Sequence, residues 1–257
     1  VSAITRQDLV DFHQKNYGPL NMVMVVVGAV EAEQVFDLFE NRLGNWRNPQ
    51  AGAEPKFPQI DRPVKTLREH VPIMGKSQAD IVMGTLGPKR CAPEYLAVSL
   101  GNNILGQFGM MGRIGEVVRE KAGLAYYAST SVNAWIEGGS WEVSAGVNPV
   151  NVDKAIHLII EELKRFKSEP VLRSELEDSQ ANYIGRMPLA LESNAGVANA
   201  ILNLERFDLG LDYYQRYPQL VKEVTVEQVL QAAQQYLDPD KLVIASAGPG
   251  AGKEREA

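Results

Sequence analysis

The sequence predicts an α+β fold, a two-layer sandwich in which a mostly antiparallel sheet carries helices on one face. Three observations support this prediction. A strand-rich stretch runs from residue 64 to residue 147, a helix-rich stretch follows from residue 152, and a helix–turn–strand unit occurs twice. A run of strands followed by a run of helices favours an antiparallel sheet with the helices gathered on one side.

The repeated unit spans residues 5–28 and 225–248, which match without a gap at an offset of 220 residues. Each copy has an amphipathic helix, a turn and a buried strand. The corresponding features are a capping threonine (Thr5, Thr225), a proline that ends the helix (Pro19, Pro239) and a strand (22–27, 242–247). This match indicates an internal duplication.

The elements between the two copies follow from hydrophobic periodicity. A helix at 31–43 is expected to turn an apolar side toward a core, formed by Val35, Leu38, Phe39 and Leu43. The clearest helix, at 152–166, has Ile156, Ile159, Ile160 and Leu163 on one side. The other expected elements are strands at 64–71 and 78–85, helices at 93–105 and 113–121, a hairpin at 124–133 and 139–147, and helices at 170–186, 194–209 and 212–220.

Prolines between residues 51 and 63 indicate a linker between two domains. We expect residues 1–50 to be the end of a first domain, 64–250 a complete second domain, and 251–257 a disordered tail. The chain opens with "VSAITRQDL", which suggests a processed or truncated start. If the duplication holds, about 157 residues of the first domain are missing, because 161 residues separate position 64 from the second copy and only 4 precede the first.

Composition argues against several classes of function. A net charge of −6 makes a nucleic-acid partner unexpected. The single cysteine, Cys91, forms neither an internal disulfide nor a CxxC motif, which fits a reducing compartment. The longest apolar run, residues 22–30, is less than half of a membrane span, so we expect no transmembrane segment. Bacterial cytoplasm, periplasm and mitochondrial matrix all stay open as locations.

The stretch "VVREKAGLAYYAST" at 117–130 joins a charged helical turn to an alternating strand. Gly123 is expected to end the helix in the left-handed conformation. In the strand that follows, Leu124, Tyr126 and Ala128 are expected on one face.

Reversal of the chain at this glycine would bring the guanidinium of Arg119 near the phenol of Tyr126. The alternative is an ordinary surface: Arg119 pairs with Glu116 or Glu120 in solvent, and Tyr126 packs.

The run "NNILGQFGMMGRIGEVVREKAGLAYYASTSV" resembles the second, non-catalytic domain of the M16 (pitrilysin/insulinase-type) zinc metallopeptidases. Residues 119–126 match the family's R-E-K-x-G-L-A-Y at every fixed position, and the opening "ITRQDLVDFHQKNYGPLNMVMVVVGAV" is similar to the end of its first domain. The resemblance implies a LuxS-like, M16-like fold. It also implies that Arg119 and Tyr126 bind the backbone of a peptide opposite the zinc site, a task suited to a fork of donors and a single phenolic donor.

Catalysis in that family rests on H-x-x-E-H, whose histidines bind zinc and whose glutamate activates water. The three histidines of this chain, His13, His70 and His157, do not fit that motif; His157 has only Glu161 at i+4. We therefore expect no catalytic residue, metal ligand or bound cofactor here, with the zinc in a complementary domain.

The stretch "GQFGMMG" at 106–112 places Gly106, Gly109 and Gly112 three residues apart. A dinucleotide fingerprint follows a strand, whereas a helix precedes this stretch, so we interpret it as a flexible loop. The resemblance implies that the loop touches substrate. "GPGAGK" at 248–253 misses the Walker spacing. A nucleotide-binding module is nevertheless an alternative, which failure to bind ATP or NAD would remove.

The leading hypothesis is the substrate-positioning, non-catalytic half of an M16-type zinc peptidase, which needs an H-x-x-E-H domain on the same chain or on a partner subunit. Its expected partners are a peptide substrate and that domain, in a homodimer or heterodimer. The alternative is a catalytically inert assembly subunit of the same fold, like the core proteins of a respiratory complex.

Overall fold

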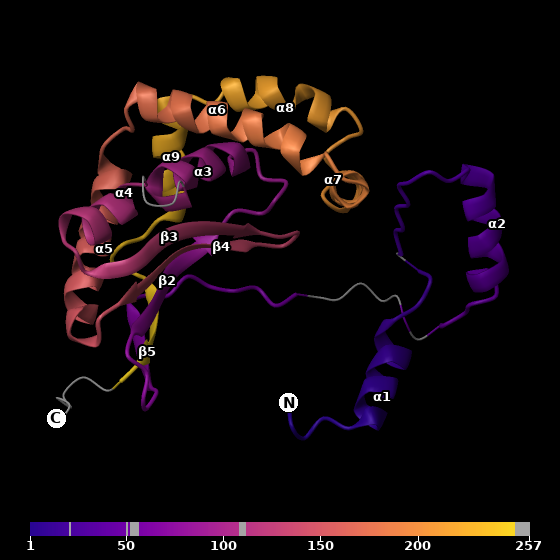
Figure 1. The fold of residues 1–257 in the computed structure, drawn as a ribbon, viewed down its shortest axis with the longest axis horizontal. Coiled ribbons are helices and arrows are strands. Elements are labelled where there is room, and N and C mark those ends of the chain that lie inside the picture. The colour runs from indigo at the N-terminus through magenta and orange to yellow at the C-terminus, as the bar shows by residue number, and fades with distance from the viewer. Residues whose placement is uncertain (21, 50, 52–56, 108–111, 250–257) are drawn as a thin grey trace. The chain divides into compact units, whose positions relative to one another are not determined.

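The computed structural model describes residues 1–249 apart from 21, 50, 52–56 and 108–111 (Figure 1). The chain divides into two compact units. We call Val1–Gln59 with Pro188–Leu211 the first unit, and Ile60–Met187 with Asp212–Ala257 the second unit. The domain boundaries expected at residues 50, 63 and 250 stay predictions, and the expected tail 251–257 lies outside the described residues.

The second unit is built on a sheet with strand order β1-β5-β2-β4-β3. Its strands are β1 (Leu67–Pro72), β2 (Ala79–Gly87), β3 (Ala125–Ala134), β4 (Gly139–Val147) and β5 (Val243–Gly248). β1 runs parallel to β5, and every other neighbouring pair is antiparallel. The mostly antiparallel sheet expected from the sequence is confirmed.

Helices of the second unit lie over one face of this sheet (Figure 1). They are α3 (Tyr95–Asn102), α4 (Arg113–Gly115), α5 (Val152–Ser168), most of α6 (Arg173–Ala190), α8 (Tyr213–Lys222) and α9 (Val226–Tyr236), with π-helical turns η1 (Asn103–Gln107) and η3 (Glu116–Lys121) and a 3-10 turn η4 (Pro149–Asn151). The α+β two-layer arrangement is thereby confirmed. Among the described residues, no helix is long and apolar enough to cross a membrane.

The core lies between the sheet and these helices, and strand alternation shows which face is covered. Ile81 and Met83 of β2 are fully buried, while Val82 between them is 43% exposed. Such alternation is typical of a sheet with one packed and one open face.

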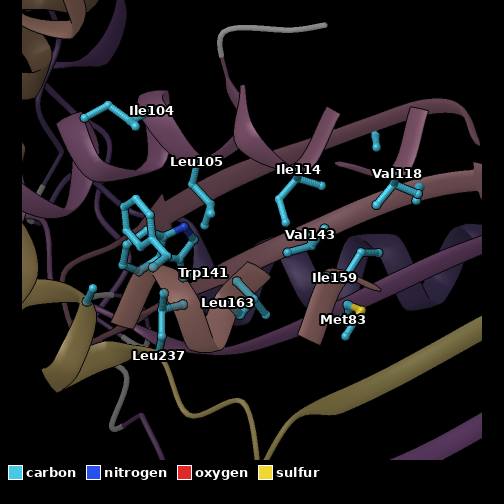
Figure 2. Close-up of a cluster of buried hydrophobic side chains, with 14 of the residues drawn as sticks. Met83, Ile104, Leu105, Ile114, Val118, Trp141, Val143, Ile159, Leu163 and Leu237 are labelled. Carbon is cyan, nitrogen blue, oxygen red and sulfur yellow. The ribbon is translucent and has the colours of Figure 1, made fainter. Parts of the chain in front are cut away.

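Helix 113–121, formed by α4 and η3, is bound into this core by its apolar side. Ile114 and Val118 are fully buried and pack in the same cluster as Ile159 and Leu163 of α5 (Figure 2). Beside them, the ring of Trp141 meets the ring of Phe166 edge-on, with 6.3 Å between centroids. Burial of each aliphatic side chain contributes about 1.5–3 kcal/mol to the free energy of folding. The helix is therefore anchored to the core by Ile114 and Val118.

Both copies of the repeated unit begin as expected. Thr5 and Thr225 each form a capping box, with Asp8 at the start of α1 (Arg6–Asn16) and with Gln228 at the start of α9. The strand predicted at 242–247 is β5, one residue displaced.

The strand predicted at 22–27 is wrong for this chain, because the described residues of this segment form no strand. A strand needs neighbours to bond to, and β5 has β1 and β2 on its two sides. Within the described part of the first unit no strand is available to residues 22–27, and Val23 and Val26 stay nearly half exposed.

The first unit also contains α2 (Ala32–Leu43) and α7 (Asn194–Arg206). The helix predicted at 31–43 is confirmed, but its apolar side does not reach a core as expected. Val35, Phe39 and Leu43 are half-buried, and Leu38 is 55% exposed. Among the described residues of α1 and α2, none is buried.

Candidate functional site

The expected helix at 113–121 is present as α4 running directly into η3, since Gly115 between them keeps helical φ and ψ of −61° and −44°. It ends at Gly123, whose φ of +63° confirms the predicted left-handed glycine. The N–H groups of Gly123 and Leu124 donate to the carbonyls of Arg119 and Val118, both at 3.0 Å. The chain therefore reverses within two residues and enters β3.

Arg119 lies in η3 with its side chain 37% exposed. Its Nε is 3.8 Å from Oε1 of Glu120, a loose ion pair, while Glu116 pairs with Lys121 at 2.8 Å. Exposed pairs of this kind contribute little. Within the described part of the chain the Arg119 guanidinium donates no hydrogen bond, which leaves its N–H groups available to a ligand.

Tyr126 occupies a β-bulge at the start of β3. Ala125 pairs with Val147 and Tyr127 pairs with Gly146, so Tyr126 is the extra residue between them. The expectation that Tyr126 shares a face with Ala128 is wrong, because the bulge interrupts the alternation: Ala128 is buried and Tyr126 is 63% exposed. Bulges of this kind re-aim a side chain.

The neighbouring Tyr127 is bound to the sheet instead. Its hydroxyl donates to Oδ1 of Asp80 at 3.2 Å. Burial and the charge of Asp80 raise the pKa of Tyr127. A hydrogen bond from Lys76 lowers the pKa of Asp80, and a bond from Gln78 at 2.8 Å acts in the same direction. Of the two adjacent tyrosine hydroxyls, only that of Tyr127 has a hydrogen bond among the described residues.

The structure thus puts Arg119 and Tyr126 on the two sides of one reversal, both accessible to solvent. Among the described residues they share no hydrogen bond, so the structure does not join them directly. Whether a ligand bridges them stays a prediction.

The expected glycine loop is closed at its base by contact between its end glycines. A Cβ added to Gly112 would lie 2.5 Å from Cα of Gly106, and one added to Gly106 would lie 2.7 Å from Cγ2 of Thr130. Real Cβ atoms do not approach so closely. Gly106 and Gly112 therefore have a packing role, and Gly109 lies outside the described residues.

A buried polar network supports the first end of this loop. Asn102 accepts a bond from Nε1 of Trp141 at 2.9 Å, and its carbonyl accepts one from Thr130 at 3.0 Å. The hydroxyl of Tyr183 on α6 lies 3.0 Å from Oε1 of Gln107. Burial raises the pKa of Tyr183 far above its usual value, which keeps the hydroxyl protonated as a donor. Sequence reasoning missed this network, although two adjacent asparagines ending an apolar helix are its signal.

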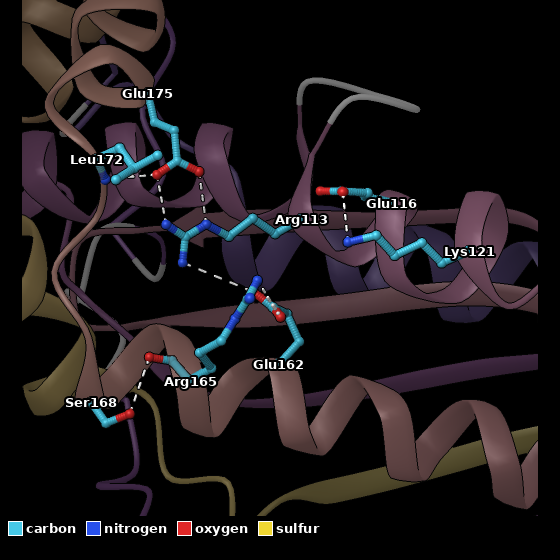
Figure 3. Close-up of polar contacts among 8 residues, drawn as sticks. All are labelled: Arg113, Glu116, Lys121, Glu162, Arg165, Ser168, Leu172 and Glu175. Carbon is cyan, nitrogen blue, oxygen red and sulfur yellow. Dashed lines mark hydrogen bonds and ion pairs between the residues drawn. The ribbon is translucent and has the colours of Figure 1, made fainter.

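A cluster of four charged residues, Arg113, Glu162, Arg165 and Glu175, supports the second end (Figure 3). Arg113 donates two parallel bonds to Glu175 on α6, Nε to Oε1 at 2.8 Å and Nη2 to Oε2 at 2.6 Å. Its Nη1 lies 3.9 Å from Oε1 of Glu162 on α5. Sequence analysis did not find this cluster, because its members are ordinary charged residues and Arg113 is 62 residues away from Glu175 in the chain.

The three histidines of this chain lie on different elements and form no zinc site with the other described residues. His13 stacks on Tyr17 of the first unit, at 5.1 Å between rings. Nδ1 of His70 lies 2.9 Å from Oγ of Ser246, and His157 is on α5. In the ranges that the structure describes, no group of three histidine, cysteine, aspartate or glutamate residues could hold a metal ion.

Comparison with known proteins finds a matching family. A profile described as the peptidase M16 inactive domain matches residues 3–183, which include Arg119 and Tyr126. An uncharacterised zinc protease of Mycobacterium leprae is 28% identical over 99% of this chain and 57% of its own length. The β subunit of the mitochondrial processing peptidase of Saccharomyces cerevisiae is 23% identical over 78% of this chain and 46% of its own.

Comparison with solved structures finds the same fold. The peptidase M16 inactive domain from Pseudomonas fluorescens superposes with a TM-score of 0.85 at 28% identity, over 98% of this chain and 59% of that one. A chain of complex III from Candida albicans, at 14% identity and a TM-score of 0.68, covers 85% of this chain and 53% of its own, and shares the fold alone. The chain spans about half the length of the curated relatives it matches, from 44% to 57% for the first three.

Proposed function

Because this chain belongs to the family of the peptidase M16 inactive domain, we propose that it is the non-catalytic, substrate-positioning half of a zinc-dependent metalloendopeptidase. The zinc belongs to a complementary domain with the H-x-x-E-H motif, on the same polypeptide or on a partner subunit in a homodimer or heterodimer. Relatives named zinc proteases support the reaction class, hydrolysis of peptide bonds.

One observation carries the assignment of roles: the stretch R-E-K-A-G-L-A-Y at 119–126 lies in the matched region and folds as a helix, a left-handed glycine and a bulged strand. It presents one guanidinium and one phenol to solvent. Both donate to carbonyl oxygens, which every peptide offers whatever its side chains. The proposed role is therefore to bind the peptide backbone with little regard to sequence.

The first prediction tests this role in the completed enzyme, the chain together with its H-x-x-E-H domain. Arg119→Ala is expected to lower kcat/KM roughly 10- to 150-fold, because a hydrogen bond to a charged group is worth about 1.5–3 kcal/mol when shielded from water. Tyr126→Phe is expected to lower it about 2- to 10-fold, as a neutral bond is weaker.

Tyr127→Phe is the matched control, since that hydroxyl bonds to Asp80 within the sheet. Circular dichroism and thermal unfolding should show that all three variants stay folded. Unchanged kcat/KM in both Arg119→Ala and Tyr126→Phe would remove the role. No hydrolysis with any H-x-x-E-H partner would favour an inert assembly subunit instead.

A further inference from the structure

The charge cluster of Arg113, Glu162, Arg165 and Glu175 is separate from the two residues assigned to the peptide, yet it holds the start of the helix that contains Arg119 (Figure 3). Arg113 is the first residue of α4, and Arg119 lies six residues later in the continuous helix 113–121. At the α-helical rise of about 1.5 Å per residue, the two Cα atoms lie at most about 9 Å apart along the axis. A shift in the position of Arg113 would therefore move Arg119 through the short helical segment between them.

Arg113 is held on three sides. Its side chain is only 12% exposed, and its fork binds both carboxylate oxygens of Glu175. The guanidinium carbon lies 5.4 Å from the ring centroid of Phe166 on α5. Two parallel bonds fix the direction of a guanidinium as well as its position, so this contact sets the rotation of the helix.

The carboxylates that receive Arg113 are themselves fixed. Oε2 of Glu175 also accepts the N–H of Leu172 at 2.7 Å, at the start of α6. Burial raises the pKa of Glu175, but the bonds from Arg113 and Leu172 outweigh it and the net pKa is lowered, so the carboxylate is charged at neutral pH. Glu162, 4% exposed, accepts a bond from Arg165 at 2.9 Å. The two carboxylates near Arg113 thus come from both α5 and α6.

Two further contacts limit the same helix. Gly112, just before Arg113, packs on the backbone of Gly106. At the other end the reversal at Gly123 ties the carbonyl of Val118 to the start of β3. The side of helix 113–121 that carries Ile114 and Val118 is buried in the core. These contacts hold both ends of the helix and limit its rotation.

A buried charge cluster contributes little net stability compared with well-packed apolar side chains. The cluster instead fixes the orientation of the helix that begins at Arg113. We propose that Arg113 is a positioning residue that, through its two bonds to Glu175, sets where the guanidinium of Arg119 meets the peptide. This inference rests on the proposed function of Arg119.

The test is a double-mutant cycle in the completed enzyme, with kcat and KM measured separately on one peptide. Arg113→Lys keeps the charge and loses the planar fork. It is expected to raise KM with little change in kcat, the same pattern as Arg119→Ala, and to lower kcat/KM about 10- to 100-fold. In the Arg119→Ala background it should change kcat/KM less than about 2-fold, because the residue through which it acts is gone.

Arg173→Lys is the matched control. Like Arg113, Arg173 is the first residue of a helix, here α6, and pairs with a glutamate, Glu177, but its side chain is 88% exposed. It should leave kcat and KM unchanged. If Arg113→Lys does not fold, Glu175→Gln takes its place. It keeps the shape of the side chain, but an NH2 donor replaces one of the two oxygens that accept from Arg113, so one bond is lost and the other loses the charge of its acceptor. The same non-additivity is expected.

The outcomes are distinguishable. If Arg119→Ala leaves kcat/KM unchanged, the role proposed for Arg119 fails and this inference fails with it. If Arg119→Ala lowers kcat/KM while Arg113→Lys does not, or if the two effects multiply in the double variant, Arg113 does not act through Arg119 and only the inference is overturned.

Discussion

The two glycines at the base of the loop show how a single residue type is required by backbone contact. Gly112 touches the backbone of Gly106, and Gly106 touches Thr130 of β3, so neither position has room for a Cβ. Gly185, in the middle of α6, has nothing within 4 Å of its added Cβ. The same substitution should therefore have opposite effects at these sites.

We predict that Gly112→Ala lowers the free energy of unfolding by about 1–3 kcal/mol, because the new methyl group forces backbone atoms apart. Gly185→Ala should raise it by about 0.5–1 kcal/mol, because alanine loses less conformational freedom in a helix and meets no obstacle here. Urea denaturation of the two variants and the parent chain measures both. Equal effects of the two substitutions would contradict the packing role of Gly112.

At the scale of elements, the two copies of the repeated unit separate local from tertiary stabilisation. α1 and α9 have the same length, 11 residues, and the same type of capping box. They differ in burial: α9 buries Val229, Ala232, Ala233 and Tyr236, whereas α1 buries none of its described residues. A helix of this length is marginal in water without packing.

Amide hydrogen exchange of the 257-residue chain is therefore expected to differ strongly between the two helices. Amides of α1 should be protected by about tenfold or less, while those of α9 should approach the protection set by global unfolding. The shared capping boxes make each helix the control for the other. Comparable protection in both would show that α1 is stabilised by contacts that its exposure does not reveal.

How far the sequence predicted these elements depends on the range of the forces involved. Caps at Thr5 and Thr225, and the strand 139–147, were predictable because capping and alternation are local patterns. The two π-helical turns and the bulge at Tyr126 were not, since each adds one residue to a regular pattern without changing its composition.

The candidate site divides in the same way. Arg119, Tyr126 and the left-handed Gly123 were found from one short stretch of sequence. Arg113 and Glu175 are 62 residues apart, and nothing near either residue indicates the other. The supporting residues of the site were therefore beyond sequence reasoning, while the proposed ligand-binding pair was within it.

At the scale of the whole molecule, the chain has the second unit with its own core and the first unit with little burial in its helices. Its curated relatives named zinc proteases are about twice as long. No metal-binding group is found among the residues that the structure describes. The length of these relatives supports the proposal that hydrolysis needs a complementary H-x-x-E-H domain.

We predict that the isolated chain does not hydrolyse a peptide when zinc is added, and that hydrolysis appears when a polypeptide with the H-x-x-E-H domain is supplied. Release of a fluorescent peptide product measures both conditions, with the H-x-x-E-H polypeptide alone as the control. Zinc-dependent hydrolysis by the isolated chain would refute the complementation model.

The place of β5 in the sheet affects how the protein is made. β5 is the last strand among the described residues, yet it lies between β1 and β2. At the residues that precede β1 and β5, the N–H of Leu242 donates to the hydroxyl of Thr66, which lies 176 residues earlier in the chain. While the ribosome is still adding residues, β1 has no partner and the edge of β2 is open. Unpaired strand edges favour aggregation, and synthesis that stops before residue 243 leaves β1 without the strand that joins it to the sheet.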